Sequence, residues 1–149
     1  MDNLFAYGTL MCGDILQAVA GRQLEAMPAR LLNYRRLQVR GEHYPAIRQQ
    51  PGWQVDGILY RQVTRQLWHR LDLFEGHMYR RVSVAVRLPS GQMVIAYTYV
   101  IRPGSRQRLL SRDWDFDTFL AQGKVHFLQY YPGFSTVATG RMSGVSATR

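Results

Sequence analysis

The sequence predicts an α+β fold, in which a curved or closed mixed β-sheet packs against two or three outer helices. Strand-like segments dominate the 149 residues, and the segments between them are too short for the crossovers of a doubly wound parallel sheet. Hydrophobic residues make up 46% of the chain and charged residues 19%, which provides enough apolar material for a packed core. We therefore expect one domain over residues 1–149, with a flexible tail at residues 135–149, where Ser, Thr and Gly are frequent.

The first predicted elements are a strand and a short helix. Residues 3–7 form an apolar run that favours a buried strand. Residues 13–21 fit one or two helical turns, because Asp14 lies near the start and Gly21 can end the helix.

Three further segments favour extended structure. Residues 27–39 follow a β-like pattern that is broken near Asn33. Residues 44–47 form a short extended piece, since the residue before a proline avoids the helical region. Residues 53–63 favour another strand, in which Gly57 indicates a bulge or a close approach of the backbone.

The clearest helix covers residues 64–76. Thr64 can cap its N-terminus, and Gly76 can end it. The apolar residues recur at the spacing of one helical face and should point to a core: Leu67, Leu71 and Phe74, with Trp68 beside them.

The C-terminal half adds a hairpin and a second long helix. Residues 79–101 alternate in polarity on both sides of the polar turn "LPSGQ", which predicts a β-hairpin. Residues 111–123 favour a helix in which Asp113 is the cap, while Asp115 and Asp117 suit its positive N-terminal end.

Charge and composition restrict the function. The net charge is +9, but the arginines are scattered and form no basic tract, a pattern that does not favour nucleic-acid binding as the main function. Cys12 is the only cysteine, so an intramolecular disulfide is impossible and a reducing, cytoplasmic setting is the simplest interpretation. The N-terminus lacks the pattern of a signal peptide, and we expect no membrane span because no apolar run approaches about 20 residues.

Glu75 is the first candidate for chemistry. It lies at the C-terminal end of the predicted helix, where unpaired carbonyl groups carry a partial negative charge and a cation would be more stable. The neighbouring residues are largely apolar. Both conditions favour the neutral acid, so we expect the pKa of Glu75 to be raised, as a general acid or base near neutral pH requires. An ordinary solvated glutamate in a loop is the alternative.

The stretch "YGTL" at residues 7–10 is the second candidate. A strand that ends in a glycine, followed by free N–H groups, can form a small anion-binding concavity. Such a loop could hold a carboxylate or a developing oxyanion, with Thr9 and Tyr7 adding hydroxyl groups. The alternative is an ordinary turn after a strand.

Other polar residues give weaker patterns. Asp72 could form a carboxylate pair with Glu75, but an ion pair with Arg65, Arg70 or an arginine of the hairpin is the favoured interpretation. Cys12 could be a nucleophile with a histidine partner, although a lone cysteine more often fills space in a core. The candidate histidines are His43, His69, His77 and His126. A metal site built from His69, Asp72 and His77 fits no known ligand spacing.

Three motifs together resemble a known family. They occur in the order "FAYGTLMCG" (5–13), "LDLFEGHMYRRVSVAV" (71–86) and "RDW" (112–114), with strand-like "YPAI", "VDGILYRQV" and "AYTYV" between them. This arrangement resembles the γ-glutamylcyclotransferase-like superfamily and, within it, the YGTL-type γ-glutamylamine cyclotransferase branch. The resemblance spans roughly residues 3–124, and residues 125–149 have no recognised counterpart.

The resemblance implies a fold and a reaction. The fold would be a small mixed β-barrel flanked by helices, with a pocket at one end. The α-amino group of a small γ-glutamyl substrate would attack its own γ-carbonyl carbon, forming 5-oxoproline and releasing an amine, with no cofactor and no metal. The "YGTL" loop points away from the branches that act on glutathione and on γ-glutamyl amino acids.

The resemblance also implies roles for individual residues. Glu75 matches the catalytic glutamate. Tyr7, Gly8, Thr9 and Leu10 match the loop that binds the substrate, and Tyr79 and Arg81 match supporting residues of the pocket. Two other functions stay open at this point: a non-catalytic protein that binds a small ligand on the same fold, and a nucleic-acid binder that uses its arginines.

Overall fold

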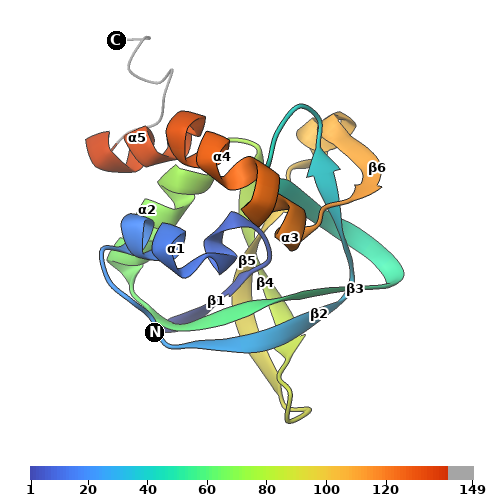
Figure 1. Cartoon of the computed structure of the whole chain (residues 1–149). Helices are drawn as coiled ribbons and strands as arrows, with labels where there is room; N and C mark the ends of the chain where they lie inside the picture. The colour runs from blue at the N-terminus through green and yellow to red at the C-terminus, as the bar shows by residue number, and fades with distance from the viewer. Residues whose placement is uncertain (141–149) are drawn as a thin grey trace.

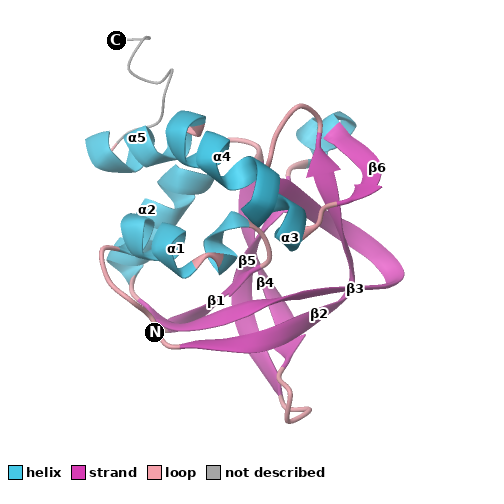
Figure 2. Ribbon diagram, in the orientation of Figure 1, coloured by secondary structure: helices cyan, strands magenta, loops and turns pink. Residues whose placement is uncertain are grey.

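The computed structural model describes residues 1–140 and has the architecture of a β-barrel with helices on one side (Figures 1 and 2). The strand order is β3-β1-β5-β4-β2, and β2 also pairs with β3, which closes these five strands into a barrel. The pairing of β1 with β5 is parallel and the other pairings are antiparallel, so the sheet is mixed. The predicted α+β class with a mixed barrel is therefore confirmed. The strands are β1 (Asp2–Ala6), β2 (Ala26–Val39), β3 (Pro45–Val63), β4 (Tyr79–Arg87) and β5 (Met93–Ile101), while β6 (Leu109–Asp113) adds to the edge at β2.

The helices gather beside β1 and the end of the barrel (Figure 2). They are α1 (Gly13–Ala20), α2 (Arg65–Glu75), α3 (Phe116–Thr118), a π-helical turn (Phe119–Gly123), α4 (Lys124–Tyr130) and α5 (Pro132–Thr139), with a short 3-10 helix at Thr9–Met11. Another short 3-10 helix, Pro103–Arg108, lies apart from them beside β6 (Figure 2). Within residues 1–140, no helix is both long and apolar enough to cross a membrane.

Strand β1 separates the two cores of the molecule. Successive side chains of a strand point to opposite faces of the sheet. Phe5 belongs to the cluster inside the barrel, whereas Leu4 and Ala6 belong to the cluster between the barrel and the helices. The end of β1 therefore lies where the two cores meet, and the loop that follows it emerges at that place.

Several local predictions are confirmed. Helix α2 starts after Thr64, whose Oγ1 accepts the N–H of Leu67 at 3.2 Å. Helix α1 ends at Gly21, which has a left-handed φ of 77°. Gly57 is a site of close approach, because a Cβ atom there would collide with the carbonyl oxygen of Ala6 and the ring of Phe5.

The segments predicted at residues 44–47 and 53–63 both fall on one strand, β3, which begins at Pro45, so Tyr44 precedes it. It pairs with β2 in a long hairpin whose register shifts between Leu32 and Tyr34. Asn33 lies at this shift with a φ of 64°, and its Oδ1 accepts the N–H of Gly52 at 3.1 Å. The predicted break near Asn33 is thus a local irregularity inside the hairpin.

The helix predicted over residues 111–123 begins later than expected. Its first residues form β6, because Asp113 pairs with Leu37 in the sheet and its carboxylate forms an ion pair with Arg35 at 2.8 Å. The cap is Asp115, whose Oδ2 accepts the N–H of Thr118 at 2.9 Å.

The predicted flexible tail also requires correction. Residues 135–139 belong to helix α5, and Gly140 ends this helix with a φ of 74°. The remainder of that prediction, residues 141–149, lies outside the described residues.

Candidate active site

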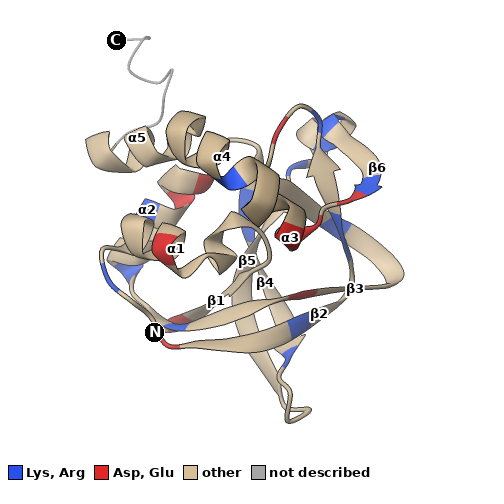
Figure 3. Cartoon of the chain, in the orientation of Figure 1, with Lys and Arg blue, Asp and Glu red and all other residues tan. Residues whose placement is uncertain are grey.

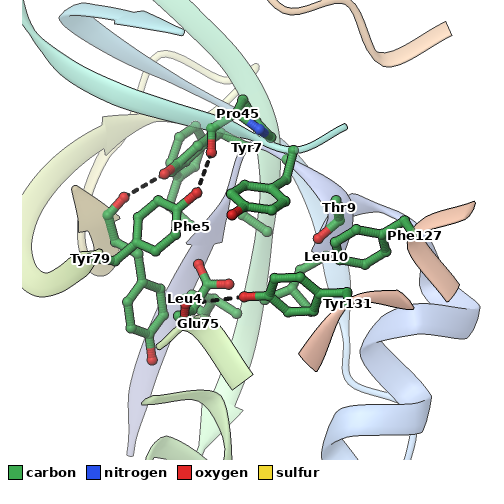
Figure 4. Close-up of a pocket in the computed structure, with 14 residues that line it drawn as sticks. Leu4, Phe5, Tyr7, Thr9, Leu10, Pro45, Glu75, Tyr79, Phe127 and Tyr131 are labelled. Atoms are coloured by element: carbon green, nitrogen blue, oxygen red, sulfur yellow. Dashed lines mark hydrogen bonds between the residues drawn. The ribbon is translucent and has the colours of Figure 1, made fainter. Parts of the chain in front are cut away.

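A small pocket lies where the end of β1, the end of α2 and the C-terminal helices meet (Figure 4). Its empty volume is about 400 Å³, of which about 30 Å³ can be reached by the centre of a water molecule. Its walls are mostly aromatic and apolar, and Glu75 is the only charged residue among them. The lining residues are Leu4, Phe5, Ala6, Tyr7, Gly8, Thr9, Leu10, Tyr44, Pro45, Glu75, Tyr79, Tyr99, Phe127 and Tyr131.

Glu75 is the last residue of α2, and its carboxylate lies among the aromatic rings (Figure 4). Burial, followed by the negative charge of Asp72, raises the pKa of Glu75 from 4.5 to about 8. The residue as a whole keeps an intermediate solvent exposure, so it is the enclosure of the carboxyl group that matters for its protonation. The direction of this change is the one that the sequence predicts, although the strongest charged neighbour is Asp72.

The loop after β1 forms a second wall of the pocket. The carbonyl oxygens of Gly8 and Thr9 accept the N–H groups of Met11 and Cys12, at 3.0 and 3.1 Å, so the loop is wound into a short 3-10 helix. The first N–H groups of such a turn have no partner within it and can bind a ligand. A Cβ atom at Gly8 would lie 2.8 Å from Cγ of Pro45, so only glycine fits here without a shift.

Arg36, on β2, contacts the backbone of this loop and does not line the pocket. Its Nη1 donates to the carbonyl oxygen of Tyr7 at 2.8 Å and to that of Asp56 at 3.2 Å. Burial lowers the pKa of its guanidinium, and its Nε is buried without a partner in the described part of the chain. No pattern in the sequence marks Arg36 as a residue of the site.

Tyrosine hydroxyl groups connect the walls of the pocket. The hydroxyl of Tyr7 donates to the carbonyl oxygen of Tyr99, and that of Tyr79 donates to the carbonyl oxygen of Pro45, both at 2.6 Å. Burial raises the pKa of Tyr7 and of Tyr79 well above the usual value, so both stay neutral near pH 7. These two rings therefore act as fixed, uncharged walls.

Arg81, in contrast, lies outside the pocket, which corrects its predicted placement there. Its guanidinium forms an ion pair with Asp72 at 3.0 Å and lies over the ring of Trp68, 4.6 Å from the centroid. Asp72 also accepts the hydroxyl of Tyr99 at 2.7 Å. The favoured prediction for Asp72, an ion pair with an arginine of the hairpin, is confirmed, and this pair explains why Arg81 does not reach the pocket.

Eight lining residues were not predicted as site residues: Leu4, Phe5, Ala6, Tyr44, Pro45, Tyr99, Phe127 and Tyr131. Six of them come from strands or their ends, where nothing in the local pattern marks a pocket. For the C-terminal residues a signal was present, because aromatic residues recur at helical spacing at positions 127, 131 and 134. The frequent Ser, Thr and Gly at residues 135–149 instead led to the prediction of a flexible tail.

The alternative sites receive little support. Burial raises the pKa of the Cys12 thiol, the opposite of what an activated nucleophile requires. Among residues 1–140, no three His, Cys, Asp or Glu side chains are arranged to hold a metal ion. Basic residues are spread over both the barrel and the helices (Figure 3), and several are paired with carboxylates, as in Arg30–Asp56 and Lys124–Asp14.

Known proteins are similar to this chain in sequence and in fold. The family described as "Gamma-glutamyl cyclotransferase, AIG2-like" matches residues 4–116. "Protein AIG2 C" of Arabidopsis thaliana is 29% identical over 116 residues, which cover 77% of this chain and 70% of that protein. A solution structure of an Arabidopsis thaliana protein is 26% identical, with a TM-score of 0.66 and coverage of 86% of this chain and 78% of that chain.

A structure described as a "Gamma-glutamyl cyclotransferase" has the same fold, with a TM-score of 0.59 and coverage of 97% of this chain and 90% of the other. Its identity of 13% supports the likeness of fold alone. The match to the family extends from β1 to the start of α3 and includes both the loop at residues 7–10 and Glu75. This chain therefore belongs to the γ-glutamyl cyclotransferase, AIG2-like family.

Proposed function

We propose that the protein is a γ-glutamyl cyclotransferase of the γ-glutamylamine type, in which Glu75 is the general acid and base. The observation that carries this proposal is a single enclosed carboxyl group, its pKa raised to about 8, in an aromatic pocket that the loop at residues 7–10 also lines. A group with this pKa can exchange protons with an amine near neutral pH, because the two acidities are similar.

The proposed reaction proceeds within one substrate molecule. Ionised Glu75 takes a proton from the α-ammonium group, and the freed amine attacks the γ-carbonyl carbon. A new C–N bond forms, and the carbonyl oxygen becomes an oxyanion. When the oxyanion collapses, the original bond to the leaving nitrogen breaks, and Glu75 returns the proton to that nitrogen. The ring nitrogen gives up its second proton to Glu75, which passes it to the released amine. The products are 5-oxoproline and the amine in its ammonium form, and no water is consumed.

The walls of the pocket fit this reaction. Attack within one molecule needs mainly a correct orientation, a base and donors for the oxyanion. In the proposal, the amides of Gly8 to Leu10 bind the substrate carboxylate or the oxyanion, while the rings of Tyr7 and Tyr79 hold the glutamyl chain. The α-ammonium group beside Glu75 would favour its ionised form, because an opposite charge lowers the pKa of a carboxyl group.

The composition of the pocket also favours an amine as the leaving group. No Lys or Arg is among the lining residues, so a leaving amino acid would bring a carboxylate without a cation to pair with it. An uncharged alkyl or aryl amine meets only apolar and aromatic surface. We therefore expect γ-glutamylamines to react faster than γ-glutamyl amino acids or glutathione.

The test is an assay of the purified protein with γ-glutamylamines, γ-glutamyl amino acids and glutathione, in which 5-oxoproline is measured by mass spectrometry. Glu75→Gln should lose at least about a hundredfold in kcat, a typical contribution of a positioned acid or base. Glu25→Gln is the matched control, because Glu25 is exposed and pairs with Arg61. Equal turnover by Glu75→Gln would exclude Glu75 as the base. Binding of a γ-glutamyl compound without any 5-oxoproline would favour a non-catalytic binding protein.

A further inference from the structure

The C-terminal helices bring a tyrosine to the end of α2, directly beside Glu75 (Figure 4). Tyr131 joins α4 to α5, and its hydroxyl donates to the carbonyl oxygens of Phe74 and Glu75, at 2.6 and 3.0 Å. We propose that Tyr131 is a positioning residue, which fixes the backbone of Glu75 so that the carboxylate faces the pocket. This inference rests on the proposed function, since it assigns a residue that prepares Glu75 for its role.

The carbonyl groups that Tyr131 binds have no other partner within the helix. The last carbonyls of any helix lack intrahelical donors. At Gly76 the chain turns away with a φ of 85°, and the N–H of Gly76 returns to the carbonyl oxygen of Asp72 at 3.1 Å. The hydroxyl of Tyr131 therefore holds the final peptide groups of α2, from which the Glu75 side chain projects.

Tyr131 is itself held rigidly. Its ring stacks on Phe127 with 4.6 Å between the centroids, and it makes edge contacts with Phe74 at 5.0 Å and with Tyr44 at 5.3 Å. A Cβ atom at Gly133 would collide with the carbonyl oxygen of Phe74 and with the Tyr131 ring, so α5 approaches the end of α2 as closely as a backbone can. A group fixed in this way can orient its partner without further loss of freedom.

Tyr131 belongs to a part of the chain that follows the segment matched by the family. The matched segment ends at residue 116, while Phe127 and Tyr131 follow it and still line the pocket. The site is therefore completed by a C-terminal segment that the three recognised motifs do not include.

The change to test is Tyr131→Phe, which removes the hydroxyl and keeps the ring. Among the ionisable groups around Glu75, Asp72 is the one whose charge raises the pKa of Glu75. The nearby tyrosines, Tyr7, Tyr44, Tyr79, Tyr99 and Tyr131, have pKa values that burial and the negative charge of Glu75 raise, so they stay neutral near pH 7. Without the hydroxyl, two carbonyl oxygens near the carboxylate lose their donor, and the local potential becomes more negative. The pKa of Glu75 should then rise by about half a pH unit.

The first measurement needs no substrate. The chain contains only three glutamates, Glu25, Glu42 and Glu75, so a carbon-13 titration of glutamate-labelled protein resolves Glu75 with two internal references. Tyr130→Phe is the matched control, because Tyr130 is the neighbouring tyrosine and is 66% exposed. The second measurement is kinetic: Tyr131→Phe should lose about tenfold in kcat with little change in KM, because the aromatic ring that lines the pocket is kept.

The two proposals fail in different ways. An unchanged Glu75 titration in Tyr131→Phe, while near-ultraviolet circular dichroism shows a native fold, would overturn the positioning role whether or not the wild type is active. If the Glu75 titration shifts in Tyr131→Phe but the wild type forms no 5-oxoproline, the result would support the role of Tyr131 and contradict the proposed reaction. Equal kcat values for an active wild type and for Tyr131→Phe would also overturn the inference.

Discussion

The Nη1 atom of Arg36 lies 2.8 Å from the carbonyl oxygen of Tyr7, so a side chain of β2 holds the loop that lines the pocket. The guanidinium is largely buried, and its charge lies behind the loop, where it does not line the pocket. This contact joins the barrel wall to the candidate substrate loop and can be tested without any knowledge of the substrate.

Replacement of Arg36 by Met should lower stability. The change leaves the Tyr7 carbonyl oxygen without its donor, and an unsatisfied buried acceptor costs about 1–3 kcal/mol. Urea denaturation measures the free energy of unfolding. Arg106→Met is the control, since Arg106 is exposed and its replacement should change stability by less than about 0.5 kcal/mol. Equal losses in the two variants would contradict a specific role for Arg36.

The raised pKa of Glu75 predicts that stability depends on pH. The folded protein keeps a proton on Glu75 up to about pH 8, whereas an unfolded carboxyl loses it near pH 4.5. The folded state therefore binds more protons between these values, and the contribution of Glu75 to stability falls as the pH rises through this window. Glu75→Gln should remove this dependence. Denaturation of both proteins from pH 5 to pH 9 measures it, and parallel curves would show that Glu75 titrates normally.

Asp72 and Arg81 should adjust Glu75 in opposite directions. Removal of the Arg81 cation leaves the charge of Asp72 less screened, so Arg81→Met should raise the pKa of Glu75. Asp72→Asn removes that charge and should lower the pKa. Each change should be on the order of half a pH unit.

The pH dependence of kcat/KM measures this effect. Its rising limb should move to higher pH in Arg81→Met and to lower pH in Asp72→Asn. Arg80→Met is the control, because Arg80 is an exposed neighbour in the same strand. If the rising limb moved in the same direction in Arg81→Met and in Asp72→Asn, the result would contradict an electrostatic origin.

Replacement of Gly8 by Ala should damage both stability and activity. The new Cβ would lie 2.8 Å from Cγ and 2.9 Å from Cδ of Pro45, so the loop or the proline must move. Overpacking of this kind costs about 1–3 kcal/mol. Thermal denaturation and the 5-oxoproline assay report the two effects. Gly104→Ala is the control, since a Cβ there meets nothing within 4 Å. If Gly8→Ala kept the stability and activity of the wild type, the result would show that the loop tolerates a side chain.

The sequence predicted what depends on local pattern. The amphipathic helix with its Thr64 cap and the hairpin of residues 79–101 follow from neighbouring residues. The direction of the Glu75 pKa change was also predicted, although distant elements contribute to the burial that causes it. The errors concern long-range partners. Asp113 was predicted to cap a helix, but its pairing with β2 is decided by residues far away in the chain. Arg81 was placed in the pocket, but Asp72 holds it outside.

The missed lining residues have the same explanation. Tyr44 and Tyr131 reach the pocket because separate elements converge there, and a single sequence contains no direct record of that convergence. Arg36 acts on a loop 29 residues earlier in the chain through a backbone oxygen, which can be offered by any residue type. No motif can therefore mark this contact.

The central position of β1 has a consequence for the order of folding. The hairpins β2–β3 and β4–β5 each join neighbours in sequence, whereas β1 must pair with β3 and with β5, where Leu4 lies opposite Tyr97. Contacts between such distant residues close large loops, and they form more slowly than local ones. We therefore expect β1 to be inserted late, after both hairpins. The loop at residues 7–10 would then meet Glu75 only as the barrel closes, so a chain with most of its secondary structure in place would still lack its pocket.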